Sequence, residues 1–235
     1  MSSSGLIAAL SRSLTFHQVV PFDPSKDKLL SLDFTKDNKN ITADILQHTP
    51  LLSAYIQEQL TNAGARYGIG GYGEHRTIYS SSTVFDADQP GEEPRRLHLG
   101  TDIWGKPYTP VMAPLDGIVH SFAFNNRPGD YGATILLSHA LKETSFFTLY
   151  GHLSLNSIKN LVEGDRVEKG DVIGEFGIPA ENGQWPPHLH FQLVENIGDW
   201  KGDYPGVCKF SEKEKWLANS PDPDIILQMN RYINQ

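Results

Sequence analysis

The stretch His188-Leu189-His190-Phe191-Gln192-Leu193-Val194 decides the fold of this 235-residue chain. Polar and apolar side chains alternate along it, as they do in a strand that buries one face. His188, His190 and Gln192 therefore share one face of the predicted strand, and the leucine and phenylalanine side chains between them are expected to point into a core. Two imidazoles are thus held side by side on a rigid element.

The composition around this strand favours a packed, β-rich protein. Hydrophobic residues make up 39% of the chain and charged residues 20%, so a core can form and extensive disorder is not expected. The 21 glycines and 15 prolines indicate many turns. The net charge is -8 and no dense run of Lys or Arg occurs, so neither nucleic acid nor an anionic membrane is an expected partner.

From about residue 95 onward, short apolar runs alternate with turn residues such as Asp-Gly and Gly-Asp pairs. Short strands at this spacing predict a mainly β fold with an antiparallel sheet or sandwich. A short helix is expected in the turn-rich tail, near residues 225–229. The strand candidates that precede residue 188 are 111–114, 117–124, 133–139, 145–153 and 171–176.

Residues 1–75 have a different pattern, mixed and partly helical. Thr49-Pro50 is typical of an N-cap followed by proline at the first helical position, and Gly64 is expected to end this helix. Residues 68–73, Gly-Ile-Gly-Gly-Tyr-Gly, lack the Gly-Lys-Ser/Thr of a phosphate loop, and we interpret them as a flexible lead into the main domain. We expect an N-terminal segment at 1–75 and a β domain at 76–235 with a turn-rich C-terminal extension.

Neither export nor membrane insertion is expected. The N-terminus lacks the basic region and long apolar run of a signal peptide, and no apolar stretch reaches membrane-spanning length. Cys208 is the single cysteine, which excludes an intramolecular disulfide and fits a reducing compartment. We therefore expect a soluble cytoplasmic protein, and the sequence does not indicate its oligomeric state.

A second group of metal-ligand residues lies upstream, in His98-Leu99-Gly100-Thr101-Asp102. In an extended strand, His98 and Asp102 would sit about 13 Å apart. They could not then share an ion whose ligands lie at about 2.0–2.2 Å, so the chain must bend, and Gly100 permits the bend. Folded back towards His190, they complete a set of two histidines and one carboxylate. That set is typical of catalytic zinc with a fourth position left for water.

A third histidine strengthens this pattern. His152 follows Tyr150-Gly151 at the end of a predicted strand and can project into a cleft. His152 and His188 could then hydrogen-bond a zinc-bound water and a developing oxyanion. Taken alone, a His-x-His pattern would instead predict a solvated strand face. Arg76 and Tyr79 could line the site. Surface or structural positions are expected for the other histidines: His17, His48, His75, His120 and His139.

These residues resemble the M23 zinc metallopeptidases, the lysostaphin and LytM-like group of peptidoglycan endopeptidases. The resemblance covers roughly residues 95–195, with its motifs in order and at suitable spacing. Three stretches resemble the signatures of the family, and two resemble the segments between them. The signatures are His98-Leu99-Gly100-Thr101-Asp102, Tyr150-Gly151-His152-Leu153 and His188-Leu189-His190-Phe191, and the connecting segments are 111–119 and 162–174.

The resemblance implies a two-sheet antiparallel β arrangement, sandwich- or barrel-like, with the site in a groove. It implies that His98, Asp102 and His190 bind one zinc ion per chain. It implies that His152 and His188 are the catalytic histidines, and that the substrate is a peptide bond of peptidoglycan or a related peptide.

Two features depart from the secreted members of the family. Residues 182–187, Asn-Gly-Gln-Trp-Pro-Pro, replace a loop rich in Ser, Thr and Gly, and the tail segments 203–207 and 220–223 also differ. Here the chain looks more like the M23-type domains found fused to aminotransferase and kinase-like domains. Two alternatives therefore stay open: a metal-retaining binding or regulatory module, and a zinc hydrolase of a small amide. Residues 1–75 could also shield the groove.

Overall fold

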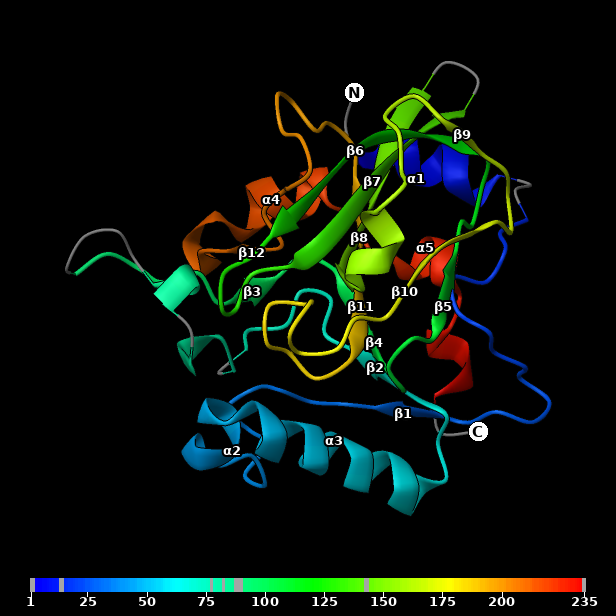
Figure 1. The fold of residues 1–235 in the computed structure, drawn as a ribbon. Helices are drawn as coiled ribbons and strands as arrows, with labels where there is room; N and C mark the ends of the chain where they lie inside the picture. Colours follow the sequence, from blue (N-terminus) through cyan, green and yellow to red (C-terminus); the bar gives the residue numbers. More distant parts are fainter. Residues whose placement is uncertain are drawn as a thin grey trace.

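The mainly β fold predicted from the sequence is confirmed in a computed structural model of the chain (Figure 1). The structure describes residues 3–12, 15–76, 78–81, 83–86, 91–141 and 144–233. In this part of the chain, no helix is long and apolar enough to cross a membrane.

One eight-stranded sheet forms the centre of the fold. All its neighbouring strands are antiparallel except the first two, which are parallel, so the sheet is mixed. Within the described residues the sheet order is open, and no closed barrel forms. In order across the sheet, the strands are β1 (Leu29–Ser31), β2 (Tyr67–Gly70), β4 (Thr101–Trp104), β11 (His188–Val194), β8 (Thr144–Leu153), β7 (Gly132–Leu141), β6 (Gly117–Asn125) and β9 (Arg166–Val167).

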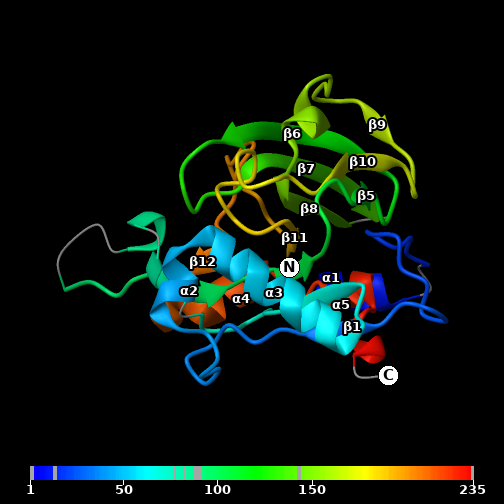
Figure 2. The same ribbon diagram turned by 60° about the horizontal axis from the view of Figure 1, so that its bottom comes forward.

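Two small sheets and several helices complete the fold. The small sheets pair β5 (Pro110–Met112) with β10 (Val172–Glu175), and β3 (Leu97–His98) with β12 (Val207–Cys208). Helices α2 and α3 lie together beside β1, at one edge of the large sheet (Figures 1 and 2). The α-helices are α1 (Ser3–Ser11), α2 (Ala43–Gln47), α3 (Thr49–Ala63), α4 (Lys213–Asn219) and α5 (Asp224–Leu227). The 3-10 helices are η1 (Ile78–Ser81), η2 (Thr83–Phe85), η3 (Leu155–Ile158), η4 (Phe210–Glu212) and η5 (Asn230–Tyr232).

Strand β11 has the two-faced character that its alternation predicts. Leu189, Phe191 and Leu193 are fully buried and belong to the main hydrophobic core. The histidines alternate with them on the opposite face. Every residue of β11 is buried, because strands β4 and β8 flank it and loops cover its polar face. The polar face is therefore the floor of an enclosed site rather than a solvated surface.

The other predicted strands and the tail helix are confirmed, with boundaries shifted by a residue or two. The five strand candidates upstream of residue 188 correspond to β5, β6, β7, β8 and β10, and the tail helix to α5. Several helices and strands were not predicted: α1, α2, α4, β1, β2, β3, β4, β9 and β12. Most of these are strands of two to four residues, too short for alternation to identify them.

Helix α3 was predicted at its correct position, with one correction at its start. Gly64 ends it in the left-handed conformation, with φ of 60°, as expected. The N-cap, however, is His48 and not Thr49, which is the first helical residue. The Thr49 hydroxyl donates instead to the carbonyl oxygen of Gln184, at 2.6 Å. This contact ties the N-terminal segment to the loop that leads into β11.

The glycine-rich stretch 68–73 does not form the predicted flexible lead. Its first part is strand β2, which pairs with β4. The glycines allow close packing: a Cβ on Gly68 would collide with the Leu32 side chain, and one on Gly70 would lie 2.8 Å from the Leu32 carbonyl oxygen. Through β1 and β2, residues from the N-terminal segment join the large sheet, while the proposed division at residues 75 and 76 stays a prediction.

The loop before β11 depends on Gly183, and this gives a first testable prediction. Gly183 has φ of 81°, its carbonyl oxygen accepts from the Gly129 amide at 2.8 Å, and an added Cβ would overlap the Asp130 carbonyl oxygen. Gly164 has φ of 95° but open space around it. Gly164→Ala should therefore lower the free energy of unfolding only by the conformational penalty of about 1–2 kcal/mol. Gly183→Ala should lower it further, because its Cβ also clashes with the backbone.

Thermal unfolding of both variants measures the difference. At about 2–4 °C per kcal/mol for a chain of this size, Gly183→Ala should lower the Tm at least twice as much as Gly164→Ala. Equal shifts would show that the loop moves freely away from Asp130.

Candidate metal centre

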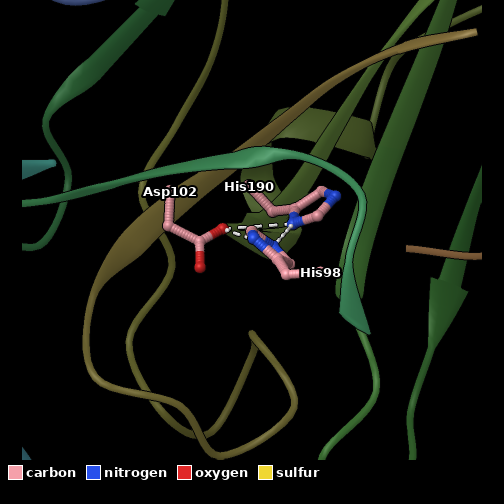
Figure 3. Close-up of side chains that lie close together, drawn as sticks. All are labelled: His98, Asp102 and His190. Atoms are coloured by element: carbon pink, nitrogen blue, oxygen red, sulfur yellow. Dashed lines mark hydrogen bonds and ion pairs between the residues drawn. The ribbon is translucent and has the colours of Figure 1, made fainter. Parts of the chain in front are cut away.

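Three predicted ligands meet at the polar face of β11. His190 lies opposite Asp102 in the register of β11 and β4, and His98 lies at the end of β3, which pairs with β12. The ligand atoms of His98, Asp102 and His190 all lie within 4.8 Å of one another, and their side chains point towards a common centre (Figure 3). The sequence prediction that these residues come together is confirmed.

The bend between β3 and β4 occurs where it was expected, and Gly100 is needed for a second reason. A Cβ at this position would lie 2.6 Å from both Cε1 and Nε2 of His190 and 2.8 Å from the Phe191 carbonyl oxygen. These distances are shorter than van der Waals contact. Glycine therefore leaves room for the His190 ring as well as permitting the chain to bend.

The hydrogen bonds around the cluster fix which histidine nitrogens face its centre. His98 Nδ1–H donates to the Gly71 carbonyl oxygen at 2.9 Å, which leaves the Nε2 lone pair facing the cluster. His190 Nε2 lies 2.9 Å from Gln192 Oε1 and donates to it, which leaves its Nδ1 lone pair. The Gln192 amide is oriented because its nitrogen donates to the Pro205 carbonyl oxygen and to Ser220 Oγ.

The centre of the cluster is therefore a set of acceptors. His98 Nε2 lies 2.9 Å from His190 Nδ1, and Asp102 Oδ1 lies 3.3 and 3.1 Å from these two nitrogens. The ring protons are on the other nitrogens, His98 Nδ1 and His190 Nε2. The lone pairs at the centre therefore face one another with no proton between them. Three buried acceptors turned towards one another repel unless a cation lies between them, so the donor set fits a metal ion.

Arg76 orients the Asp102 carboxylate by binding the oxygen that does not face the two imidazoles. It is 2% exposed, and its guanidinium donates to Asp102 Oδ2, to Glu74 Oε2 at 2.6 Å and to the Tyr79 hydroxyl at 3.2 Å. Such outer contacts orient metal ligands and are often as necessary as the ligands themselves. Asp102 therefore turns Oδ2 to Arg76 and Oδ1 to the two imidazoles.

Burial and charge keep these groups in the state that binds a cation. Burial, together with the nearby Arg76 charge, lowers the pKa of His98 to about 3, so its imidazole is neutral near pH 7. Burial alone would raise the pKa of Asp102, but His98 and Arg76 hold it well below its usual range. His98 therefore offers a neutral nitrogen, and Asp102 offers an ionised carboxylate.

The two predicted catalytic histidines lie beside the cluster as a stacked pair. The rings of His152 and His188 have centroids 4.2 Å apart and an interplanar angle of 28°, and His152 is 6.3 Å from His190 by the same measure. His152 Nδ1–H donates to the Asn182 carbonyl oxygen at 2.8 Å, and His188 Nδ1–H donates to that of Pro186 at 2.7 Å. Both Nε2 atoms therefore carry lone pairs.

Both imidazoles of this pair are neutral near pH 7, and one of the two histidines has an unusual backbone conformation. Burial lowers the pKa of His188 to about 4, and burial next to His188 brings the pKa of His152 well below its usual range. His152 also has φ of 63°, in the left-handed region that a histidine rarely adopts. Unusual backbone of this kind concentrates at functional sites.

A cavity of about 440 Å³ opens onto the cluster. Asp102 and His190 of the ligand cluster and His152 of the histidine pair line it. Its walls come from α3, from η1 and η2, from the loop after β6, from the loop before β11 and from the segment before β12. Arg76 and Tyr79, named from the sequence as candidates to line a site, do line it.

Some residues of the site were not assigned a role from the sequence. Gln192 was placed on the correct face, and its alternation with the two histidines was the available signal. Asn182, fully buried, accepts from the Trp185 amide and donates to the Gly177 and Trp185 carbonyl oxygens. No sequence pattern pointed to it. The five histidines predicted as surface or structural lie outside the metal-ligand cluster found in the described residues.

Comparisons with known proteins found similar solved structures and similar curated sequences. Among solved structures, the catalytic domain of the antimicrobial peptidase lysostaphin from Staphylococcus simulans is 25% identical, with a TM-score of 0.40, and the match covers 68% of this chain and 96% of that one. The full lysostaphin structure is 26% identical, with a TM-score of 0.42, over 71% of this chain and 52% of that one.

Two curated relatives are similar in sequence. The L-Ala--D-Glu endopeptidase of Bacillus subtilis (strain 168) is 31% identical over an alignment of 162 residues, and the match covers 63% of this chain and 47% of that protein. An uncharacterized metalloprotease of Haemophilus influenzae is 35% identical over 104 residues, which are 43% of this chain and 19% of that protein. The chain thus spans less than half the length of either relative.

A family model also matches the part of the chain that carries the site. The model of peptidase family M23 matches residues 96–201, which include the three clustered ligands and the stacked histidine pair. Residues 96–201, the part of the chain that carries the site, therefore match peptidase family M23.

Proposed function

We propose that this chain is a zinc-dependent metalloendopeptidase that hydrolyses a peptide bond. The observation that carries the proposal is the buried set of three acceptors, His98 Nε2, Asp102 Oδ1 and His190 Nδ1, with two neutral imidazoles stacked beside it. Two histidines, one carboxylate and an open fourth position are typical of catalytic zinc. The M23 family match and the peptidase relatives support the same activity.

In this proposal, bound zinc supplies Lewis-acid polarisation of the substrate carbonyl and of the attacking water. His152 and His188 handle the protons. Each has Nδ1–H fixed on a backbone carbonyl oxygen, so each has Nε2 free to accept a proton from the attacking water. One of the two imidazoles would take the single proton that the attacking water releases, and its Nε2–H would then give this proton to the nitrogen of the leaving amine as the C–N bond breaks.

The substrate class we propose is a peptide of the peptidoglycan type, because the Bacillus subtilis relative is an L-Ala--D-Glu endopeptidase. A second candidate, a short peptide or small amide, is favoured by the cavity. Its volume is within the range of small-molecule pockets, and α3 and the η1–η2 segment contribute to its walls. A long polymer would need an open groove along the whole site.

Digestion of a defined panel tests the function. The zinc-loaded chain would be incubated with intact cell-wall sacculi, with purified muropeptides, with peptides that contain an L-Ala–D-Glu bond and with short glycine peptides, and the products identified by mass spectrometry. Cleavage supports the peptidase, and release only from short substrates selects the second candidate. Binding of a panel member without any product would favour the alternative of a metal-retaining binding module.

Gln192 provides a test of the proposed ligand geometry. It is fully buried and accepts from His190 Nε2–H, so it fixes the nitrogen that faces the metal. Gln192→Leu should weaken zinc binding by about 10- to 100-fold, as losses of outer-shell partners usually do. Competition with a chromophoric chelator measures the affinity. Gln57→Leu on the exposed surface of α3 is the control, and equal affinity in both variants would exclude this tautomer assignment.

A further inference from the structure

Trp185 has a hydrogen-bond donor that nothing in the described part of the chain satisfies. Among the side-chain nitrogen and oxygen atoms there that are fully shielded from solvent, Trp185 Nε1 is the one without a hydrogen-bond partner, and the whole residue is 9% exposed. Buried polar groups nearly always find a partner, and an unmade bond costs about 1–3 kcal/mol. An orphaned donor of this kind points to an acceptor from outside the chain.

The position of this donor is set by rigid contacts. The Trp185 amide donates to Asn182 Oδ1, and its carbonyl oxygen accepts from Asn182 Nδ2, each at 3.0 Å. Pro186 and Pro187 follow and lead directly into β11. The tryptophan of this loop lines the cavity.

The surroundings of the indole tie it to the reaction centre. Trp185 lines the same cavity as Asp102 and His190, and its ring meets the His152 ring edge-on, with centroids 6.2 Å apart. On its other side lie Tyr79 and Phe85, with centroids 6.3 and 6.5 Å away. The donor is thus held in an apolar, aromatic wall, where a hydrogen bond is stronger than in water.

We infer that Trp185 is a substrate-binding residue, whose Nε1–H donates to a carbonyl oxygen one residue away from the scissile bond. The inference rests on the proposed peptidase function and adds a binding subsite to it. Because Nε1 is buried, binding requires a change of side-chain rotamer in the cavity wall, and such changes are common at binding sites. The subsite favours a peptide over an alkyl chain of the same length.

Two matched probes isolate this hydrogen bond. N-acetylglycine hydroxamate and pentanohydroxamate have the same chain length and the same metal-binding group, but only the first has a carbonyl oxygen one residue away. Their Kd values would be measured by calorimetry on the zinc-loaded full chain, on Trp185→Phe and on Trp216→Phe. Trp216 is the control because its Nε1–H already donates to Glu212, at 2.8 Å, and it does not line this cavity.

The parent chain and Trp216→Phe should bind N-acetylglycine hydroxamate about tenfold more tightly than pentanohydroxamate, and Trp185→Phe should lose that preference. A preference that persists in Trp185→Phe, or equal Kd values in the parent, overturns the inference and leaves the peptidase proposal intact. If neither probe binds the zinc-loaded parent, the metal site itself fails, and both proposals fall with it.

A second readout leaves Trp185 itself unaltered. The four tryptophans give four indole N–H resonances in a nitrogen–proton correlation spectrum, and single Phe variants of Trp104, Trp200 and Trp216 assign the fourth by elimination. N-acetylglycine hydroxamate should shift the Trp185 indole proton downfield, and pentanohydroxamate should not. An unchanged Trp185 resonance in the presence of saturating N-acetylglycine hydroxamate contradicts the proposed hydrogen bond.

Discussion

Zinc binding is expected to be lost when Asp102 is replaced by alanine. The change removes one of three ligands and leaves His98 Nε2 and His190 Nδ1 as the remaining donors. Because loss of an outer-shell partner alone weakens binding by about 10- to 100-fold, loss of this ligand should exceed 100-fold. Peptidase activity should disappear with the metal. Zinc content after gel filtration, measured by mass spectrometry, gives the result directly.

The same replacement should destabilise the fold, and a second variant separates the two effects. Arg76 is buried, and Asp102→Ala leaves its guanidinium with Glu74 as its single carboxylate partner, at 2.6 Å. Breaking a buried ion pair costs about 3–5 kcal/mol. Asp102→Asn keeps an acceptor for Arg76 but removes the ligand charge, so it should fold better and still bind zinc poorly. Asp37→Ala, at an exposed position, is the control.

Zinc retained at one ion per chain in Asp102→Asn would contradict the proposed ligand set. Loss of zinc in Asp37→Ala would show that the assay reports stability rather than coordination.

The second large effect is expected at His152, where activity should fall while zinc is retained. His152 is not among the three clustered ligands, but its Nε2 is free beside them. Removing a general base typically lowers kcat by about 10²- to 10⁴-fold. His152→Ala should show this loss with one zinc per chain and a similar KM. His120→Ala on β6, outside the cavity, should keep full activity.

The left-handed backbone at His152 permits a sharper version of this experiment. Alanine at φ of 63° keeps the strain of the position, whereas glycine removes it. His152→Gly should therefore be as inactive as His152→Ala but have a higher Tm. Recovery of activity in the glycine variant would mean that the imidazole is not the proton acceptor.

Local patterns were sufficient to predict the strand that carries the site. The alternation in β11 depends on neighbouring residues alone, and the structure places its histidines and its leucines on the two expected faces. The bend at Gly100 followed from a length argument, because an ion cannot bridge His98 and Asp102 in an extended chain. Both predictions depend on residues that are close together in the sequence, so no information on tertiary contacts was needed.

The parts that could not be predicted depend on contacts between distant residues. Arg76 lies 26 residues before the carboxylate it orients, and no local pattern joins them. Strand β2 is rich in glycine, which usually weakens a strand, and it forms because Leu32 packs closely against it. The orphaned donor of Trp185 is visible only when every neighbour of the indole is in place.

The most direct measurement of the central claim is X-ray absorption at the zinc edge of the full chain loaded with one equivalent of zinc. The proposed centre predicts two imidazole nitrogens at about 2.0–2.1 Å and carboxylate or water oxygen at about 2.0–2.2 Å, with no sulfur. A sulfur ligand at about 2.3 Å would place the metal at Cys208. Either that sulfur or a chain that remains metal-free would contradict a zinc centre built from His98, Asp102 and His190.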